Sequence, residues 1–148
     1  MKEPYSVAPR VRIVFVRDGA APYAGPIRSA ADVWRLLKEE ALAWDRERFL
    51  SLLLDARHRA IGLEEVSVGT ATASLVHPRE LFKAAILANA SALILVHNHP
   101  SGDPVPSSED RDLTRRIREA AELIGIRLLD HVVLGEGAYH SFAEAGEL

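Results

Sequence analysis

The pattern of apolar and polar positions at the start of the chain predicts a strand followed by a helix. Residues 11–16 (VRIVFV) alternate and are rich in β-branched side chains, as in a strand, and a loop rich in Gly, Ala and Pro follows through Pro26. These features indicate an N-terminal hairpin or arm. Ser29 suits the N-cap position of a helix over about residues 30–43.

The middle of the chain predicts a strand pair, a helix and a buried strand. Two apolar runs, residues 49–54 and about 60–68, flank a short polar turn and indicate antiparallel strands. Pro78 suits the first position of a helix over about residues 78–90. The short, continuously apolar run at residues 92–96 is typical of a central strand that is covered on both faces.

The last third of the chain predicts one more helix and one more strand. Apolar residues recur at helical spacing from Ser108 onward, and Gly125 is a natural stop. A final strand is expected over about residues 126–134. With no repeat or linker visible, we expect residues 1–148 to form one α/β domain, a mixed central sheet flanked by helices, with residues 1–45 as an N-terminal extension that carries a strand and a helix.

Composition narrows the chemistry that this domain can perform. The 148 residues fit one domain, and the formal charge of −3 gives no global basic field for a polyanion. The absence of cysteine excludes a thiolate zinc site, so a metal would need His, Asp, Glu or water. No apolar run approaches the roughly 18 residues of a membrane span, and the first residues lack a signal-peptide core, so a cytoplasmic location is expected.

The segment at residues 95–110, LVHNHPSGDPVPSSED, carries the candidate chemistry. His97 and His99 lie two apart at the end of an extended run, which places both imidazoles on one face. With Ser107 as N-cap, Asp110 becomes the third helical residue and points inward. Two imidazoles and one carboxylate leave the fourth position of a tetrahedral zinc ion open to water, as in catalytic zinc sites.

Such a site also needs a base that is not itself a ligand. Glu47, at the mouth of the apolar strand ERFLSLLL, is the candidate. Glu64 and Glu65 compete for this role, because they also border a strand and their spacing does not exclude them.

The segment resembles a known motif. His97-x-His99, ten intervening residues and Asp110, with Ser107 three before the Asp, is similar to the JAMM (MPN+) zinc metalloprotease motif of the JAB domain superfamily. The longer string HNHPSGDPVPSSED is similar to the RadC family, as are VGT at 68–70, HPRE at 77–80 and LLDHVVLG at 128–135. The likeness runs from about Asp45 to the C-terminus.

This resemblance implies a JAB/MPN fold of the cytidine deaminase-like type, with Zn²⁺ held by His97, His99 and Asp110. It implies that Glu47 takes a proton from the attacking water and passes it to the leaving amine, and that Ser107 helps to hold the oxyanion. The reaction of the superfamily is hydrolysis of a peptide or isopeptide amide. Ser107 could instead serve only as a helix cap.

The resemblance leaves the partners open. Full-length RadC proteins carry an N-terminal helix-hairpin-helix type region, which has no counterpart in the first 45 residues, so a link to DNA repair transfers poorly. The alternative function is a binding module without turnover. We expect a protein or peptide substrate and no membrane partner, with nucleic acid only weakly supported. Edge strands and the N-terminal arm could mediate homodimer formation or strand addition of a substrate.

Two further features have simpler interpretations. Asp130 and His131 could contact the ligands from behind, but a hydrogen-bonded core or turn histidine is the favoured interpretation. Arg111, Arg115, Arg116 and Arg118 could guide an acidic partner, but a solvated helix face is favoured.

Overall fold

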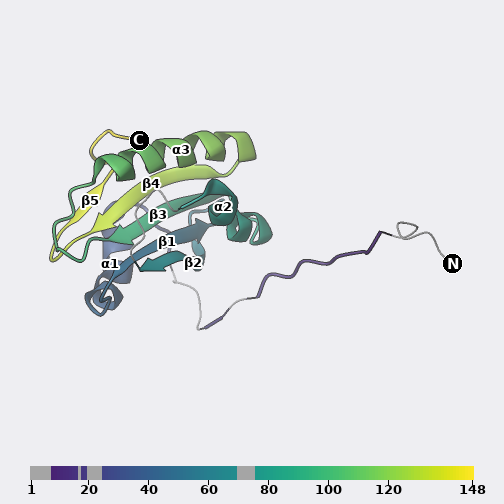
Figure 1. Ribbon diagram of the computed structural model, residues 1–148, viewed down its shortest axis with the longest axis horizontal. Coiled ribbons are helices and arrows are strands. Elements are labelled where there is room, and N and C mark those ends of the chain that lie inside the picture. Colours follow the sequence, from purple (N-terminus) through teal and green to yellow (C-terminus); the bar gives the residue numbers. More distant parts are fainter. Residues whose placement is uncertain (1–7, 17, 20–24, 70–75) are drawn as a thin grey trace.

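The computed structural model describes residues 8–16, 18–19, 25–69 and 76–148. The helices in these ranges are α1 (Ala30–Leu42), α2 (Pro78–Leu87) and α3 (Ser108–Ile124). The strands are β1 (Glu47–Leu54), β2 (Ala60–Gly69), β3 (Ala92–Asn98), β4 (Arg127–Leu134) and β5 (Tyr139–Ser141). Among the described helices, none is long and apolar enough to cross a membrane. The mixed α/β architecture expected from the sequence is confirmed (Figure 1).

The five strands form one sheet in the order β2-β1-β3-β4-β5. β1 runs antiparallel to both of its neighbours, and β3 and β4 are parallel. Parallel neighbours need a crossover, and α3 supplies it here. β5 is too short to show as a pattern in the sequence, and it pairs antiparallel with the end of β4.

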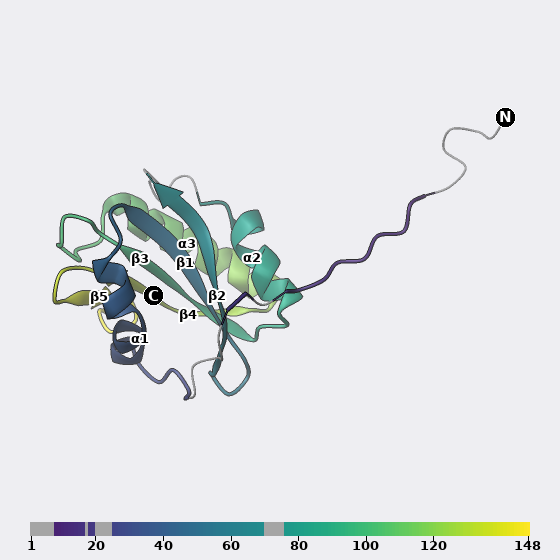
Figure 2. The ribbon, with the colours of Figure 1, turned by 90° about the horizontal axis from the view of Figure 1, so that it is seen from below.

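The two faces of the sheet are covered by different helices (Figure 2). α1 packs Val33 and Leu37 on one face, against the even-numbered side chains of β1 and β3. α2 and α3 pack on the other face, where Phe49, Leu93 and Leu95 form the core. β3 is buried along its whole length because it is central and covered on both sides.

Local sequence signals fix the helix ends. Ser29 caps α1 and Ser107 caps α3, as expected. Gly125 ends α3 in the left-handed region at φ 82°, which a residue with a side chain enters only at a cost. α2 begins at Pro78 as expected but ends at Leu87, three residues earlier than its apolar pattern indicated.

The N-terminal segment leaves the domain as an extended arm, drawn in purple in Figures 1 and 2. Residues 11–16 are extended, but they pair with no strand among the described residues. The expected loop that follows lies partly outside the described residues, at 17 and 20–24. Pro26 lies back against the domain, where it forms a bridge with Arg59, the residue before β2.

The loop after β3 rests against the turn that joins β4 to β5. Leu134 O accepts the His99 backbone N–H at 2.9 Å, and Gly102 O accepts that of Glu136 at 2.8 Å. Gly135 makes this approach possible, because a Cβ there would overlap Gly102 O and lie 2.8 Å from Pro104 Cδ. The backbone of residues 99–104 is therefore placed by β4.

We predict that Gly135→Ala destabilises the fold by about 1–3 kcal/mol, because the added methyl group meets backbone atoms that cannot move freely. Gly125→Ala is the matched control: it has open space around the new Cβ, so only its left-handed backbone should cost free energy, about 1–2 kcal/mol. Urea denaturation measures both. Only Gly135→Ala should also expose the 99–104 loop to proteolysis. Equal proteolysis of both variants would contradict this role.

Candidate metal centre

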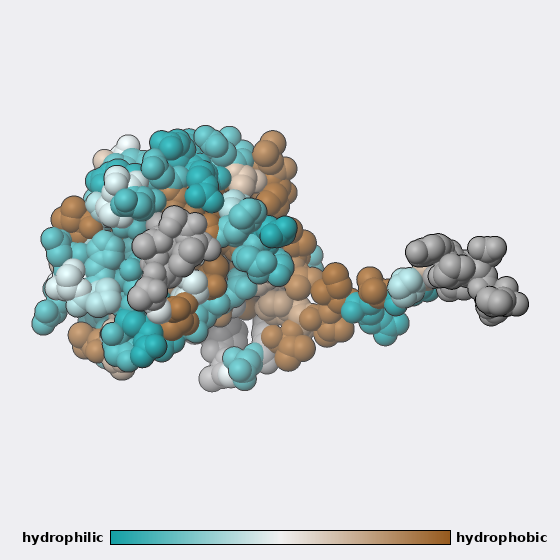
Figure 3. Space-filling model, in the orientation of Figure 1, coloured by the Kyte–Doolittle hydropathy of each residue, from teal (hydrophilic) through white to brown (hydrophobic). Residues whose placement is uncertain are grey.

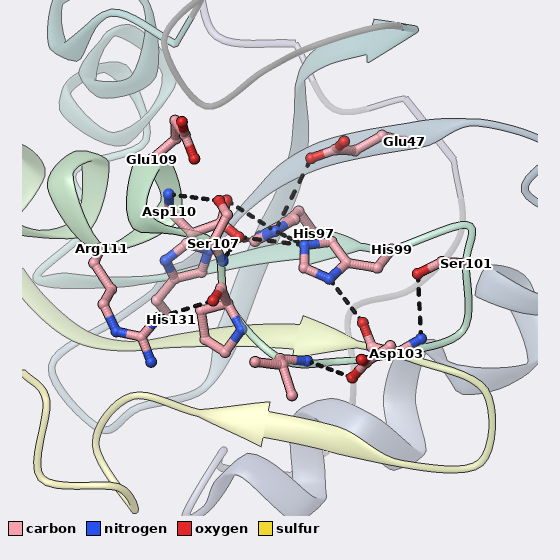
Figure 4. Close-up of polar contacts among 12 residues, drawn as sticks. Glu47, His97, His99, Ser101, Asp103, Ser107, Glu109, Asp110, Arg111 and His131 are labelled. Atoms are coloured by element: carbon pink, nitrogen blue, oxygen red, sulfur yellow. Dashed lines mark hydrogen bonds and ion pairs between the residues drawn. The ribbon is translucent and has the colours of Figure 1, made fainter.

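Four side chains converge where β3 ends and α3 begins (Figure 4). They are Glu47 from β1, His97 from β3, His99 from the following loop and Asp110 from the first turn of α3. One ligand atom of each lies within 4.8 Å of all the others. Since imidazole nitrogens and carboxylate oxygens are common metal ligands, this group could hold a metal ion.

Three of the four residues are closer to one another than to the fourth. The Nε2 atoms of His97 and His99 are 3.0 Å apart. Each also lies 3.3 Å from one carboxylate oxygen of Asp110. Glu47 stands further back, with its Oε1 4.0 Å from Nε2 of His97. The geometry therefore separates three converging groups from one carboxylate beside them.

Asp110 is placed by the cap of α3. Its Oδ2 accepts the backbone N–H of Ser107 at 2.9 Å, and Ser107 Oγ accepts the backbone N–H of Asp110 at 3.0 Å. This reciprocal capping box fixes the carboxylate, whose side chain is 4% exposed. Burial alone would raise the pKa of Asp110, but the imidazoles of His97 and His99 beside it hold that pKa well below its usual range. The group is therefore an anion at neutral pH.

A chain of hydrogen bonds behind His97 determines which ring nitrogen faces the cluster. The Thr114 hydroxyl donates its only hydrogen to the Asp110 backbone carbonyl at 2.7 Å, so it must accept from His131 Nδ1 at 2.6 Å. His131 is neutral, because burial lowers its pKa well below the usual value. Its Nε2 then accepts from His97 Nδ1 at 2.7 Å. The lone pair of His97 is left on Nε2, which faces Asp110.

The loop orients His99 in the same way. Its Nδ1 donates to the backbone carbonyl of Asp103 at 2.8 Å, so Nε2 is the nitrogen that points at the cluster. The Asp110 carboxylate beside Nε2 raises the pKa of His99, because it favours the protonated ring. Both histidines therefore direct the same ring atom at one point.

Strand register places Glu47 beside the histidines. Phe49 pairs with His97 and stacks on its ring, with ring centroids 5.3 Å apart, and Glu47 lies two residues earlier on the same face. Asn98 fixes this end of β1, since its side chain accepts the Arg48 N–H at 2.7 Å and donates to Arg46 O at 3.1 Å. Burial raises the pKa of the Glu47 carboxyl.

The structure separates the competing glutamates from the cluster. Glu65 pairs with Leu50, which faces α1, and its carboxylate binds Arg48. Glu64 pairs with Ser51, four residues along β1 from Glu47, a displacement of about 13 Å. Of the three glutamates, Glu47 alone is in the group of converging side chains.

His131 corrects one interpretation made from the sequence. A core or turn histidine without a link to the ligands was favoured, but His131 is hydrogen-bonded to His97. Asp130 instead accepts hydrogen bonds from Ser141 Oγ at 2.5 Å and from the backbone N–H of Ala143 at 2.9 Å. No sequence spacing indicates the contact between His97 and His131, because the two residues are 34 positions apart with the whole crossover between them.

The arginines of α3 lie on its exposed side. Three of them pair with carboxylates: Arg111 with Glu147, Arg115 with Asp112 and Arg118 with Glu122. Paired, solvated side chains agree with the helix-face interpretation. They leave little unpaired positive charge on this surface for phosphate groups.

Comparison with known proteins identifies the family. The sequence model of the RadC-like JAB domain matches residues 27–147. The chain belongs to the RadC-like JAB domain family. The arm at residues 8–16 lies outside the matched region, whereas the four clustered residues all lie inside it.

Relatives of this RadC-like JAB domain are longer proteins. A UPF0758 protein of Desulfitobacterium hafniense is 48% identical over 122 residues, which cover 82% of this chain and 54% of the relative. A UPF0758 protein of Symbiobacterium thermophilum is 59% identical over 102 residues, 69% of this chain and 44% of the relative. The chain thus spans about half the length of the curated relatives it matches.

We predict that Thr114→Val weakens binding of Co²⁺, used as a spectroscopic probe, by about 10- to 100-fold. The variant removes the acceptor for His131 Nδ1, so the hydrogen bonds that keep the His97 lone pair on Nε2 are lost. Thr114→Ser is the control, since it retains the hydroxyl and should bind Co²⁺ like the wild type. If Thr114→Val and Thr114→Ser bind equally, the hydrogen-bonded chain does not orient His97.

Proposed function

We propose that this domain is a zinc-dependent hydrolase of the JAMM type that cleaves a peptide or isopeptide amide. One observation carries the proposal: three potential ligands converge, and a fourth carboxylate stands beside them without belonging to the tight group. A closed structural site would use all of its protein ligands equally. The separate position of Glu47 supports a catalytic site instead.

The spacing of the donor atoms fits zinc. Ligand atoms bound at about 2.0–2.1 Å to one tetrahedral zinc ion lie about 3.3 Å from one another. The distances among His97, His99 and Asp110 are 3.0, 3.3 and 3.3 Å. The donor set of two imidazoles and one carboxylate is also a known set for catalytic zinc, with one position left for water. We therefore assign the metal as Zn²⁺.

In this proposal Glu47 is the general base. A bound zinc ion would polarise the amide carbonyl and make a water molecule acidic near neutral pH. Glu47 accepts the proton of the attacking water and later donates it to the leaving amine. Burial raises the pKa of the Glu47 carboxyl, which makes it a stronger base for this proton transfer than an exposed glutamate.

Ser107 has a second role in the proposal. Its Oγ already accepts the backbone N–H of Asp110, so its hydroxyl hydrogen is available to donate. The side chain is exposed at the start of α3, next to the buried Asp110. We assign it to stabilise the negative charge that develops on the carbonyl oxygen. Capping and oxyanion stabilisation use different parts of the same hydroxyl group.

A pocket of about 470 Å³ beside His99 offers room for the substrate chain. Trp34 and Trp44 from the α1 region line it, with Leu134 and Pro100. Pockets of this size with mainly apolar walls and a few polar groups are typical binding sites. The chain contains two tryptophans, and both lie in this pocket. Tryptophan fluorescence of this protein therefore reports on changes in this pocket.

We predict that Glu47→Gln retains zinc but lowers the rate of amide hydrolysis by about 10²- to 10⁴-fold, because the general base is lost while the ligands remain. Hydrolysis is measured by mass spectrometry on a degenerate peptide mixture with the zinc-loaded protein. Zinc content is measured on the same samples.

Glu64→Gln is the matched control, because Glu64 is half-buried on the same face of the sheet but outside the cluster. It should cleave like the wild type. Cleavage by Glu47→Gln at the wild-type rate would refute the assignment of the base. A wild-type protein that binds zinc and cleaves no peptide or isopeptide bond would refute the proposed activity.

A further inference from the structure

Most of the apolar side chains of the arm, residues 8–16, are exposed to solvent. Val11, Ile13 and Val16 are 84%, 70% and 79% exposed. No hydrogen bond joins the arm's backbone to the other described residues. Figure 3 shows these apolar side chains in brown along the arm, interrupted by hydrophilic ones. An extended, β-branched segment with free N–H and C=O groups is a strand without a sheet.

In the described part of the chain, β2 also forms a sheet edge without a neighbouring strand on its outer side. β2 ends the strand order, and beyond the bridge from Pro26 to Arg59 no described residue pairs with its outer edge. The ten residues of β2 make an edge of about 33 Å, which is long for an open edge. Leu63 and Val68 on β2 are also 42% and 45% exposed.

Charge and shape match the arm to this edge. The arm carries Arg10 and Arg12, whereas β2 carries Glu64 and Glu65. Within one chain, the Phe15 ring lies 3.9 Å from the position that a Cβ of Gly62 would take, and we take this contact as the register of the exchanged strand. Antiparallel pairing of Phe15 with Gly62 places Arg12 opposite Glu65, an opposite-charge pair of the kind that stabilises neighbouring strands.

We propose that two copies of this chain exchange arms, with residues 10–16 of each copy adding as an antiparallel strand to β2 of the other. Among the described residues, each molecule has both an unpaired extended segment and an unpaired edge, and toward its N-terminal end the arm points away from its own domain in both views (Figures 1 and 2). An exchange about one two-fold axis pairs each arm with the β2 edge of the other copy. The dimer then has no unpaired arm or β2 edge to which a third copy could add. The proposal does not depend on the metal or on hydrolysis.

The first test is the mass of the full-length protein in solution, measured by light scattering over a range of concentrations. We expect about twice the chain mass of 16.3 kDa. Val14→Pro should shift the protein to the monomer mass, because proline removes a ladder hydrogen bond. Val14→Thr is the control and should remain a dimer. The fold should survive both changes, since Val14 is 68% exposed. A monomeric wild type, or a dimer that Val14→Pro leaves unchanged, overturns the proposal.

The second test uses the absence of cysteine from the chain. Arg12→Cys and Glu65→Cys are prepared as separate proteins, mixed and oxidised, and the products are weighed by mass spectrometry. Exchange predicts a disulfide-linked heterodimer as the main product, because facing residues fall within disulfide reach. Arg12→Cys mixed with Glu39→Cys, on the distant helix α1, is the control. If the double variant Arg12→Cys/Glu65→Cys closes within single chains instead, the arm folds back on its own β2 and the exchange is wrong.

Discussion

The fixed orientation of the buried His97 ring is the constraint on which the candidate metal centre depends. His97 is fully buried, so each ring nitrogen needs a partner and neither can turn to water. The Thr114 hydroxyl and His131 supply the partner for Nδ1, which leaves Nε2 with its lone pair toward Asp110. Because Thr114 and Asp110 belong to the same helix, one turn of α3 both presents a carboxylate and orients an imidazole.

The sheet contributes the rest of the arrangement. β1 and β3 are held in register by their pairing and by Asn98, which bonds to the backbone on both sides of Glu47. The β4–β5 turn holds the loop that carries His99. Two strands, one loop and the first turn of α3 therefore bring one side chain each to a single point, and the two cores on either face of the sheet keep them there.

Short-range sequence patterns were enough to predict much of the candidate metal centre. The two histidines and Asp110 could be found from the sequence, because a strand end and a helix cap fix their directions within fourteen residues. The choice of Glu47 over Glu64 and Glu65 required the register of the β1–β2 pair, whose two irregularities cannot be read from composition. A contact of His131 with the ligands was considered but not favoured, because it crosses between parallel strands and no sequence spacing indicates it. β5 was missed because three residues carry too little pattern.

The most direct test of the central claim is zinc content after loading, measured by elemental analysis on the wild type and on Asp110→Asn at equal free zinc. The asparagine oxygen can still accept the Ser107 N–H, so the cap of α3 survives while the anionic ligand is lost. The account predicts about one zinc ion per chain in the wild type and a large loss in the variant. A wild type without zinc, or a variant that binds it equally well, would contradict the account.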